Sequence, residues 1–265
     1  INALEISRFT SDQDYLVENS AATFSTLNID IAEYARIRRA IIVNNQGNGA
    51  VFLRGTSSEI TDNLINMNSY ADFGNPAVTM VSSTRAIVTH NSFKDNSGGG
   101  ALNIFTAPST VIESNRFVNN RGGQVYLDDM YYFPAFDLFI QASLDNSSRI
   151  AYNNFIQSEP ESARHTFIYL GSHEFPRQLV MANIFSDTDY GDALALDCAS
   201  GSPELVSHSL QWGASVSTNC GPQHDQAINA DPQFRNDGEY YRLQSTSPAI
   251  GEGPGSANIG VWQGE

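Results

Sequence analysis

A short motif, apolar-x-x-Asn-x-apolar, recurs along most of the chain, and its copies share little else. The spacing between copies varies, so the motif marks a fixed core with insertions of different length. Internal repeats of about 20–50 residues are typical of solenoids, in which each repeat packs only on its neighbours. The motif positions are, in order, Asn44, Asn63, Asn91, Asn115, Asn153 and Asn183, and a late copy has His208 in this place.

The copies have the pattern of short strands and not of helix pairs. Apolar and polar residues alternate, β-branched residues are frequent, and Asn or Gly bounds each run. Several copies are followed by a glycine and a second apolar run, as in GGGALNIF from Gly98 and GDALAL from Gly191. Each coil is therefore predicted to run strand, tight Asn turn, strand, Gly turn, strand.

The repeated Asn is predicted to be structural. A sharp corner between strands needs a residue that tolerates left-handed backbone geometry, and Asn does so best after Gly. Stacked coils would join these side chains in a hydrogen-bonded ladder, with the neighbouring apolar residues inside and about 4.8 Å apart. A binding role would need such an Asn once and not in every coil. The predicted ladder contains Asn63, Asn91, Asn115, Asn153 and Asn183.

Charge limits the partners of this chain. Its 265 residues carry a net charge of -15, and Lys94 is the only lysine. Such a surface disfavours nucleic acid and anionic membranes as partners. No run approaches the roughly 18 apolar residues of a membrane span, so membrane insertion is not expected. The first residues include neither an initiator Met nor a signal pattern, and we expect a processed or truncated chain.

Cys198 and Cys220 frame a stretch rich in Ser, Gly and Pro. In an oxidising compartment they could close a disulfide that contributes about 3 kcal/mol through loop entropy. Two free thiols are the alternative.

Residues 37–262 resemble the right-handed parallel β-helix proteins of the pectate-lyase-like group. The most specific portion is DPQFRNDGEYYRLQSTSPAIGEG from Asp231, followed by NIGVW from Asn258, which resembles the end of secreted bacterial β-helix proteins. This segment is expected to cap the last coil with Phe234, Leu243, Ile250 and Trp262. The residues that match are Asp231, Pro232, Phe234, Tyr241, Leu243, Ser247, Pro248, Ala249, Ile250, Ile259 and Gly260.

The predicted fold is all-β: one right-handed parallel β-helix of about seven or eight coils with an Asn ladder and a C-terminal cap. Residues 1–36 are expected to form irregular or incomplete first coils, residues 37–230 the repeat coils, and residues 231–265 the cap. The resemblance implies a secreted or cell-surface protein that acts on polysaccharide. Lyases, glycosidases and epimerases share this fold with non-catalytic adhesins, so the fold alone does not fix the function.

A lyase needs a base, and a cation to neutralise the carboxylate of a uronic sugar. Lys94 is the candidate base, with Arg85, Arg116 or Arg121 as nearby cations. Ordinary solvated charges are the alternative. The strand-end Arg of alginate and dermatan lyases has no counterpart in GGGALNIFTAP.

A glycosidase needs two carboxylates, and Asp128 with Asp129 is the candidate pair. The aromatic residues that follow, Tyr131, Tyr132 and Phe133, could bind substrate by packing against sugar rings. A sugar-binding loop without catalysis and a plain packed loop remain open. The Asn-Thr-Asp and Gly-His-Gly motifs of polygalacturonase-like enzymes are absent.

Asp187, Asp189 and Asp192 offer oxygen ligands suited to Ca2+, although the run does not follow the EF-hand pattern and a solvated turn is the alternative. No other cofactor is indicated. We expect a secreted, carbohydrate-active module that binds or cleaves a polysaccharide or cell-surface glycan. A non-catalytic adhesin or fibre protein is the alternative, with end-to-end or lateral self-association left open.

Overall fold

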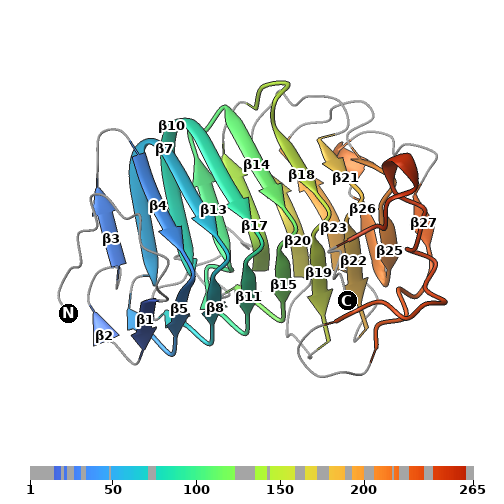
Figure 1. The fold of residues 1–265 in the computed structure, drawn as a ribbon, viewed down its shortest axis with the longest axis horizontal. Coiled ribbons are helices and arrows are strands. Elements are labelled where there is room, and N and C mark those ends of the chain that lie inside the picture. Colours follow the sequence, from blue (N-terminus) through green and yellow to red (C-terminus); the bar gives the residue numbers. More distant parts are fainter. Residues whose placement is uncertain are drawn as a thin grey trace, which may run out of the picture.

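The chain forms a parallel β-solenoid in the computed structural model (Figure 1). The structure describes residues 15–18, 21–22, 27–30, 34–47, 49–70, 76–122, 135–141, 144–158, 165–171, 179–188, 193–199, 206–216, 218–220, 227–235 and 241–260. Its strands stack in three sheets, and every pairing between named strands is parallel. The antiparallel bridge between Phe234 and Leu243 lies outside the sheets.

Sheet A runs along the lower side of Figure 1 and contains nine strands. In spatial order these are β1 (Tyr15–Glu18), β5 (Ala40–Val43), β8 (Leu64–Asn66), β11 (Ser92–Lys94), β15 (Arg116–Val118), β19 (Asn154–Gln157), β22 (Ile184–Asp187), β25 (Leu210–Trp212) and β27 (Ile228–Asn229).

Sheet B has five strands: β16 (Arg121–Gly122), β12 (Ser97–Gly98), β9 (Ser69–Tyr70), β6 (Gln46–Gly47) and β2 (Ala21–Ala22). About five turns of the solenoid, counted over the described residues, therefore carry a strand in all three sheets. The prediction of seven or eight coils is not supported, because later motif copies add strands to sheets A and C alone in this part of the chain.

Sheet C has thirteen strands and forms a broad bent wall. The early strands β7 (Val51–Thr61) and β10 (Val78–Thr89) span both halves of the wall, whereas later turns use two shorter strands. The first half contains β3 (Leu27–Asp30), β13 (Leu102–Phe105), β17 (Ala135–Gln141), β20 (His165–Leu170), β23 (Ala193–Cys198) and β26 (Ala214–Val216), and the second half contains β4 (Tyr34–Arg38), β14 (Ser109–Glu113), β18 (Arg149–Ala151), β21 (Val180–Met181) and β24 (Val206–Ser207). Two short 3-10 helices, η1 (Thr218–Cys220) and η2 (Pro254–Ser256), follow.

A column of phenylalanine rings fills the interior behind sheet A. Phe93, Phe117, Phe155 and Phe185 occupy the same register on successive strands, and all are fully buried. Their ring centroids lie 4.9, 4.7 and 5.2 Å apart along the column, with nearly parallel planes. The prediction that the apolar residue beside each motif Asn points inward and stacks at the strand spacing is confirmed.

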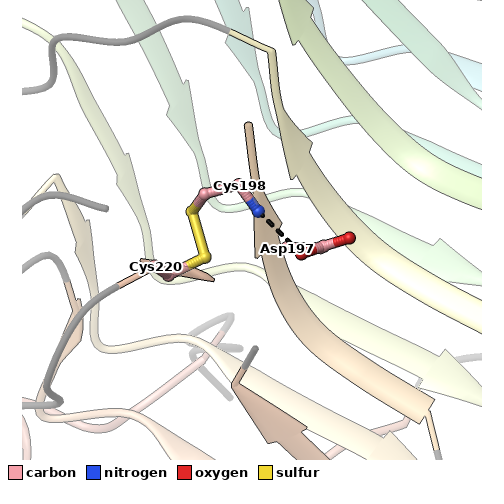
Figure 2. Close-up of a disulfide and its surroundings, with 3 residues drawn as sticks. All are labelled: Asp197, Cys198 and Cys220. Carbon is pink, nitrogen blue, oxygen red and sulfur yellow. Dashed lines mark hydrogen bonds between the residues drawn. A yellow bond between two sulfur atoms is a disulfide. The ribbon is translucent and has the colours of Figure 1, made fainter. Parts of the chain in front are cut away.

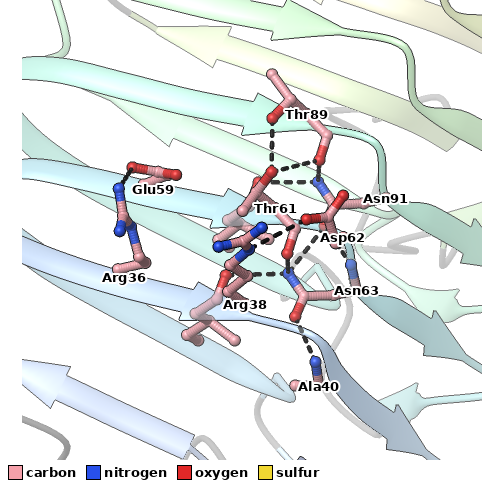
Figure 3. Close-up of polar contacts among 11 residues, drawn as sticks. Arg36, Arg38, Ala40, Glu59, Thr61, Asp62, Asn63, Thr89 and Asn91 are labelled. Carbon is pink, nitrogen blue, oxygen red and sulfur yellow. Dashed lines mark hydrogen bonds and ion pairs between the residues drawn. The ribbon is translucent and has the colours of Figure 1, made fainter. Parts of the chain in front are cut away.

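The predicted Asn ladder is also confirmed. Asn115 donates through Nδ2 to Oδ1 of Asn153 at 3.0 Å, and its own Oδ1 accepts from both nitrogens of Asn91 at 2.9 Å. The same side chain donates to the carbonyl oxygens of Val88 and Glu113. Figure 3 shows the start of this ladder at Asn63 and Asn91. The ladder thus satisfies backbone groups of two coils that would otherwise be buried without partners.

A second ladder, which the sequence reasoning missed, lies five residues further along each turn. Asn45, Asn68, Asn96 and Asn120 are fully buried and are joined by Nδ2-to-Oδ1 bonds of 2.8–2.9 Å. Its sequence signal is the last Asn in the segments NLINMN, NSFKDN and NRFVNN.

The left-handed corner residue was predicted wrongly. Positive φ belongs to the residue before each ladder Asn, for example Asp62 (58°) before Asn63 and Ser114 (56°) before Asn115. The ladder Asn is selected for its side-chain hydrogen bonds, and the corner accepts residues as different as His90, Tyr152 and Ala182.

At the two ends of the motif series, the motif residue itself is not a member of the first ladder. Asn44 has a φ of 55° and is a corner residue of the second ladder, where Asn45 is the ladder member. At the other end, His208 has a φ of 48°, and Ser209 takes the ladder position: its Oγ accepts from the backbone nitrogen of Asn183 at 3.4 Å.

The C-terminal segment packs on the outer face of sheet A. Ala249 and Ile259 form a small buried cluster with Ile184 and Leu210, which face outward from β22 and β25. The backbone nitrogen of Gly260 donates to the carbonyl of Ala182 at 2.7 Å. Phe234, Leu243 and Ile228 are partly buried and pack against this cluster. Ile250 is 40% exposed, so its predicted covering role is wrong; Trp262 lies outside the described residues.

Candidate functional site

A row of outward-facing side chains crosses the first half of sheet C. Strand pairing places Asn103, Phe139, Tyr169 and Asp197 at one register on β13, β17, β20 and β23. Each faces outward, because the strand neighbours on either side of it, such as Ile168 and Leu170 around Tyr169, are almost fully buried. All four side chains are partly exposed.

Further side chains extend this surface on both sides of the row. Phe105 and Gln141 share a register two residues along the strands, and both reach solvent. On the other side, Phe136 is 8% exposed and lies beside Tyr169. We call the combined surface the aromatic face; it consists of Asn103, Phe105, Phe136, Phe139, Gln141, Tyr169 and Asp197.

The rings of the aromatic face form one cluster. Phe139 and Tyr169 are parallel within 2°, with centroids 5.5 Å apart. Phe105 lies 5.8 Å from Phe139 and is tilted by 54°, and Phe136 lies 5.1 Å from Tyr169 and is tilted by 43°. A separation of 5.5 Å is too short for two coplanar rings, so Phe139 and Tyr169 are stacked with an offset.

A close backbone contact fixes β17 beneath these rings. Gly100 has a φ of 95°, and a Cβ added there would lie 1.7 Å from the carbonyl oxygen of Phe136. Only glycine lets the two backbones approach this closely. The position of Phe136 therefore depends on Gly100.

The predicted disulfide is present at one end of the aromatic face (Figure 2). Cys198 on β23 and Cys220 in η1 are bonded, with Cα atoms 5.1 Å apart, and both are buried. The preceding residue, Asp197, accepts a hydrogen bond from the backbone nitrogen of Cys198 at 3.0 Å. This end of the face is thus tied covalently to the chain that follows.

The second half of sheet C carries charges on its outer side instead of rings. Arg36 pairs with Glu59 at 2.7 Å and Arg38 with Asp62 at 3.2 Å (Figure 3). Arg149 holds Glu113 through two guanidinium nitrogens, and this hydrogen bonding raises the pKa of Arg149. These six residues form the charged face, whose cations are matched by carboxylates.

A buried pair of polar side chains, His165 and Asp137, lies on the inner side of β20 and β17. Nε2 of His165 is 3.3 Å from Oδ2 of Asp137, and the two side chains are 3% and 1% exposed. The His165 ring also meets Phe167 edge-on, with centroids 4.9 Å apart. Because this pair faces the core, it supports the wall behind the aromatic face and is not open to a ligand.

Of the cations predicted for a lyase, Arg85 is exposed on β10 of sheet C, level with the second half of the wall, and the others lie on other sheets. Lys94 on β11 and Arg116 on β15 both face outward from sheet A, on adjacent strands, and Lys94 is 3.7 Å from Asp95. Arg121 is exposed on β16 of sheet B. The structure brings Lys94 and Arg116 near each other, but it places neither on the aromatic face.

The predicted carboxylate pair, Asp128 and Asp129, lies outside the described residues, as do Tyr131, Tyr132 and Phe133. Of the Ca2+ candidates, Asp189 and Asp192 lie outside them too, whereas Asp187 is buried and accepts from the backbone nitrogen of Ala193 at 3.2 Å. Within the described ranges, no group of three or more His, Cys, Asp or Glu side chains could hold a metal ion.

The aromatic face can bind a ligand by contact and hydrogen bonding. It offers ring edges, two amide side chains, a phenol and one carboxylate, which suits a molecule that is both apolar and rich in hydroxyl groups. Phe105, Phe139 and Tyr169 were not singled out from the sequence. Their only signal is an aromatic residue at an outward position of an alternating strand, and the shared register depends on pairing across insertions of different length.

Comparison with known proteins identifies the family. Residues 25–200 match the family model described as the right handed beta helix region, which is more than half of the chain, and the protein belongs to this family. The match ends before the C-terminal segment, whose resemblance to secreted bacterial proteins stays a prediction. A search of curated proteins found no significant match. No helix in the described part of the chain is long and apolar enough to cross a membrane.

Proposed function

We propose that this chain is an extracellular carbohydrate-binding β-helix module whose aromatic face holds a polysaccharide. The fold is common to carbohydrate-active enzymes and adhesins, and the disulfide suits an oxidising compartment. The observation that carries the proposal is the outward row in which Phe139 and Tyr169 stand between Asn103 and Asp197. Rings flanked by amide and carboxylate groups are the combination that sugar recognition uses.

The polymer is expected to lie along the solenoid axis. Successive strands are about 4.8 Å apart, which is close to the length of one sugar unit, so each strand can meet one unit. A lateral face built in this way binds a chain and not a single sugar. Long polymers should therefore bind more tightly than monosaccharides.

Affinity electrophoresis against a panel of polysaccharides tests the proposal. Tyr169→Ala and Phe139→Ala should each reduce retention strongly, because each removes a ring that contacts the ligand. Arg36→Gln on the charged face is the matched control and should bind like the wild type. Equal retention of all four proteins would reject the aromatic face as the site.

Hydrolysis at the same face is a second candidate function. Strand β17, which carries Phe136 and Phe139, continues from the segment that contains Asp128 and Asp129. If that pair cleaves the bound polymer, new reducing ends should appear, and Asp128→Asn with Asp129→Asn should abolish them while binding persists. Release of unsaturated products would point instead to a lyase and to Lys94 with Arg116.

A further inference from the structure

We infer that the ligand of the aromatic face is an uncharged polysaccharide, built of neutral hexoses or N-acetylhexosamines, and not a polyuronate. This inference rests on the proposed function and narrows it to one class of substrate. Its basis is the distribution of charge over the outer side of sheet C.

The centre of the aromatic face carries no charge. Beside the rings, the polar side chains are the amides of Asn103 and Gln141 and the hydroxyl of Tyr169. Asp197 is the sole charged member of the face, and it is an anion. Amides donate to and accept from sugar hydroxyl and acetamido groups, whereas a carboxylate would repel a uronic acid placed beside Tyr169.

A polyuronate would need cations at the spacing of its sugars, about one per strand. In the outward row that contains Phe105, the basic residue among the described strands is Arg54, two strands away on β7. Its guanidinium lies over the ring of Phe52, 5.6 Å from the centroid. One peripheral guanidinium cannot neutralise a row of carboxylates.

The charged face cannot supply the missing cations. Arg36, Arg38 and Arg149 are each paired with a carboxylate of the same face, and Arg85, exposed beside them on β10, adds a single guanidinium. The whole chain has a net charge of -15, so the long-range field also repels a polyanion. Both the local and the global charge therefore favour a neutral polymer.

Binding isotherms at two ionic strengths test this inference. The probes are a neutral β-glucan, chitin oligosaccharides, polygalacturonate and alginate, each measured between about 50 and about 500 mM NaCl. We expect the glucan or the chitin oligosaccharide to bind with a dissociation constant that changes less than about twofold with salt.

Tyr169→Ala should weaken that binding about tenfold, and Tyr169→Phe, which keeps the ring, should weaken it less. A thermal melt of each variant identifies any that fails to fold, and Phe139→Leu then serves as the replacement.

Two other outcomes would overturn the inference in different ways. Tight binding of a polyuronate that falls steeply with salt and is lost in Arg54→Gln would show that the aromatic face takes an anionic glycan, leaving the proposed function intact. Binding of none of the four probes by a folded protein would reject the proposed function, and the inference would fall with it.

Discussion

At the scale of single residues, each corner of the solenoid uses two adjacent residues, one for the left-handed backbone and one for the buried amide. The sequence motif had assigned both roles to the same Asn. The left-handed backbone belongs to one residue, such as Asn44 or Ser114, and the buried amide belongs to the next. A glycine satisfies the first role fully and the second not at all. The two roles can therefore be tested by the same substitution at two positions.

Asn115→Gly should destabilise the protein by about 3–5 kcal/mol, because it leaves buried backbone groups of neighbouring coils without partners. Asn44→Gly is the control and should change the free energy of unfolding by less than about 0.5 kcal/mol. Urea unfolding of both variants measures the difference. Similar small losses at both positions would show that the ladder contributes little.

Asp145 provides a pH-dependent contribution. The hydroxyl and the backbone nitrogen of Ser147 donate to its Oδ1 at 2.6 and 2.9 Å, and the hydrogen bond from the hydroxyl is the main cause that lowers the pKa of Asp145 below its usual 3.8. A lowered pKa stabilises the fold above the unfolded-state value, and this contribution disappears as the pH falls through the folded-state pKa.

Asp145→Asn should therefore cost less than about 0.5 kcal/mol at neutral pH, since the carboxylate is exposed and screened by solvent. The difference from the wild type should shrink as the pH falls through the folded-state pKa of Asp145. Denaturant unfolding at a series of pH values from neutral downward measures it. A gap that widens in acid would contradict the assigned hydrogen bonds.

At the scale of elements, the aromatic face depends on how closely β17 approaches the preceding turn. Gly100→Ala places a methyl group against the carbonyl oxygen of Phe136, so β17 must move or the fold must weaken by more than about 3 kcal/mol. Polysaccharide retention by the Gly100→Ala variant should also fall.

Gly251→Ala is the control. Gly251 also has a positive φ, 76°, but nothing lies within 4 Å of its added Cβ, so the substitution should cost about 1 kcal/mol. Equal effects of the two substitutions would mean that the contact with Phe136 is unimportant.

The elements also show what the sequence could and could not reveal. The strand pattern, the inward phenylalanines and the amide ladder could be predicted, because each repeats in every coil and alternation fixes which side chain is inside. The outward cluster of Phe105, Phe139 and Tyr169 could not, because these residues occur in different copies and meet only through strand register. The corner was misassigned for a related reason: the motif marks the invariant Asn, while the left-handed residue before it varies freely.

At the scale of the whole molecule, the C-terminal part is held by packing on sheet A and by the disulfide. The bond joins positions separated by 22 residues, and it should contribute about 3 kcal/mol. A Cys198→Ala, Cys220→Ala double variant should melt at a lower temperature by several degrees, and the wild type with reductant should approach it. The double variant itself should not respond to reductant. A wild-type melting temperature that reductant leaves unchanged would contradict a stabilising bond.

The wall of sheet C is also divided as a whole into an aromatic half and a charged half. Glu113 and Arg149 belong to coils that also carry aromatic-face residues, and the other four charged residues belong to earlier coils. This division is what makes the binding proposal specific to one surface. Paired charges keep the second half solvated, and the rings of the first half stay partly exposed in a protein that buries its other phenylalanine column completely.

The most direct test is a crystal structure of the chain with a bound neutral oligosaccharide from the polymer that binds best. We expect sugar rings in contact with Phe139 and Tyr169, hydroxyl groups within hydrogen-bond distance of Asn103 or Gln141, and a ligand that runs along the solenoid axis. An oligosaccharide bound on sheet A beside Lys94 and Arg116, with the aromatic face empty, would disprove binding at the aromatic face.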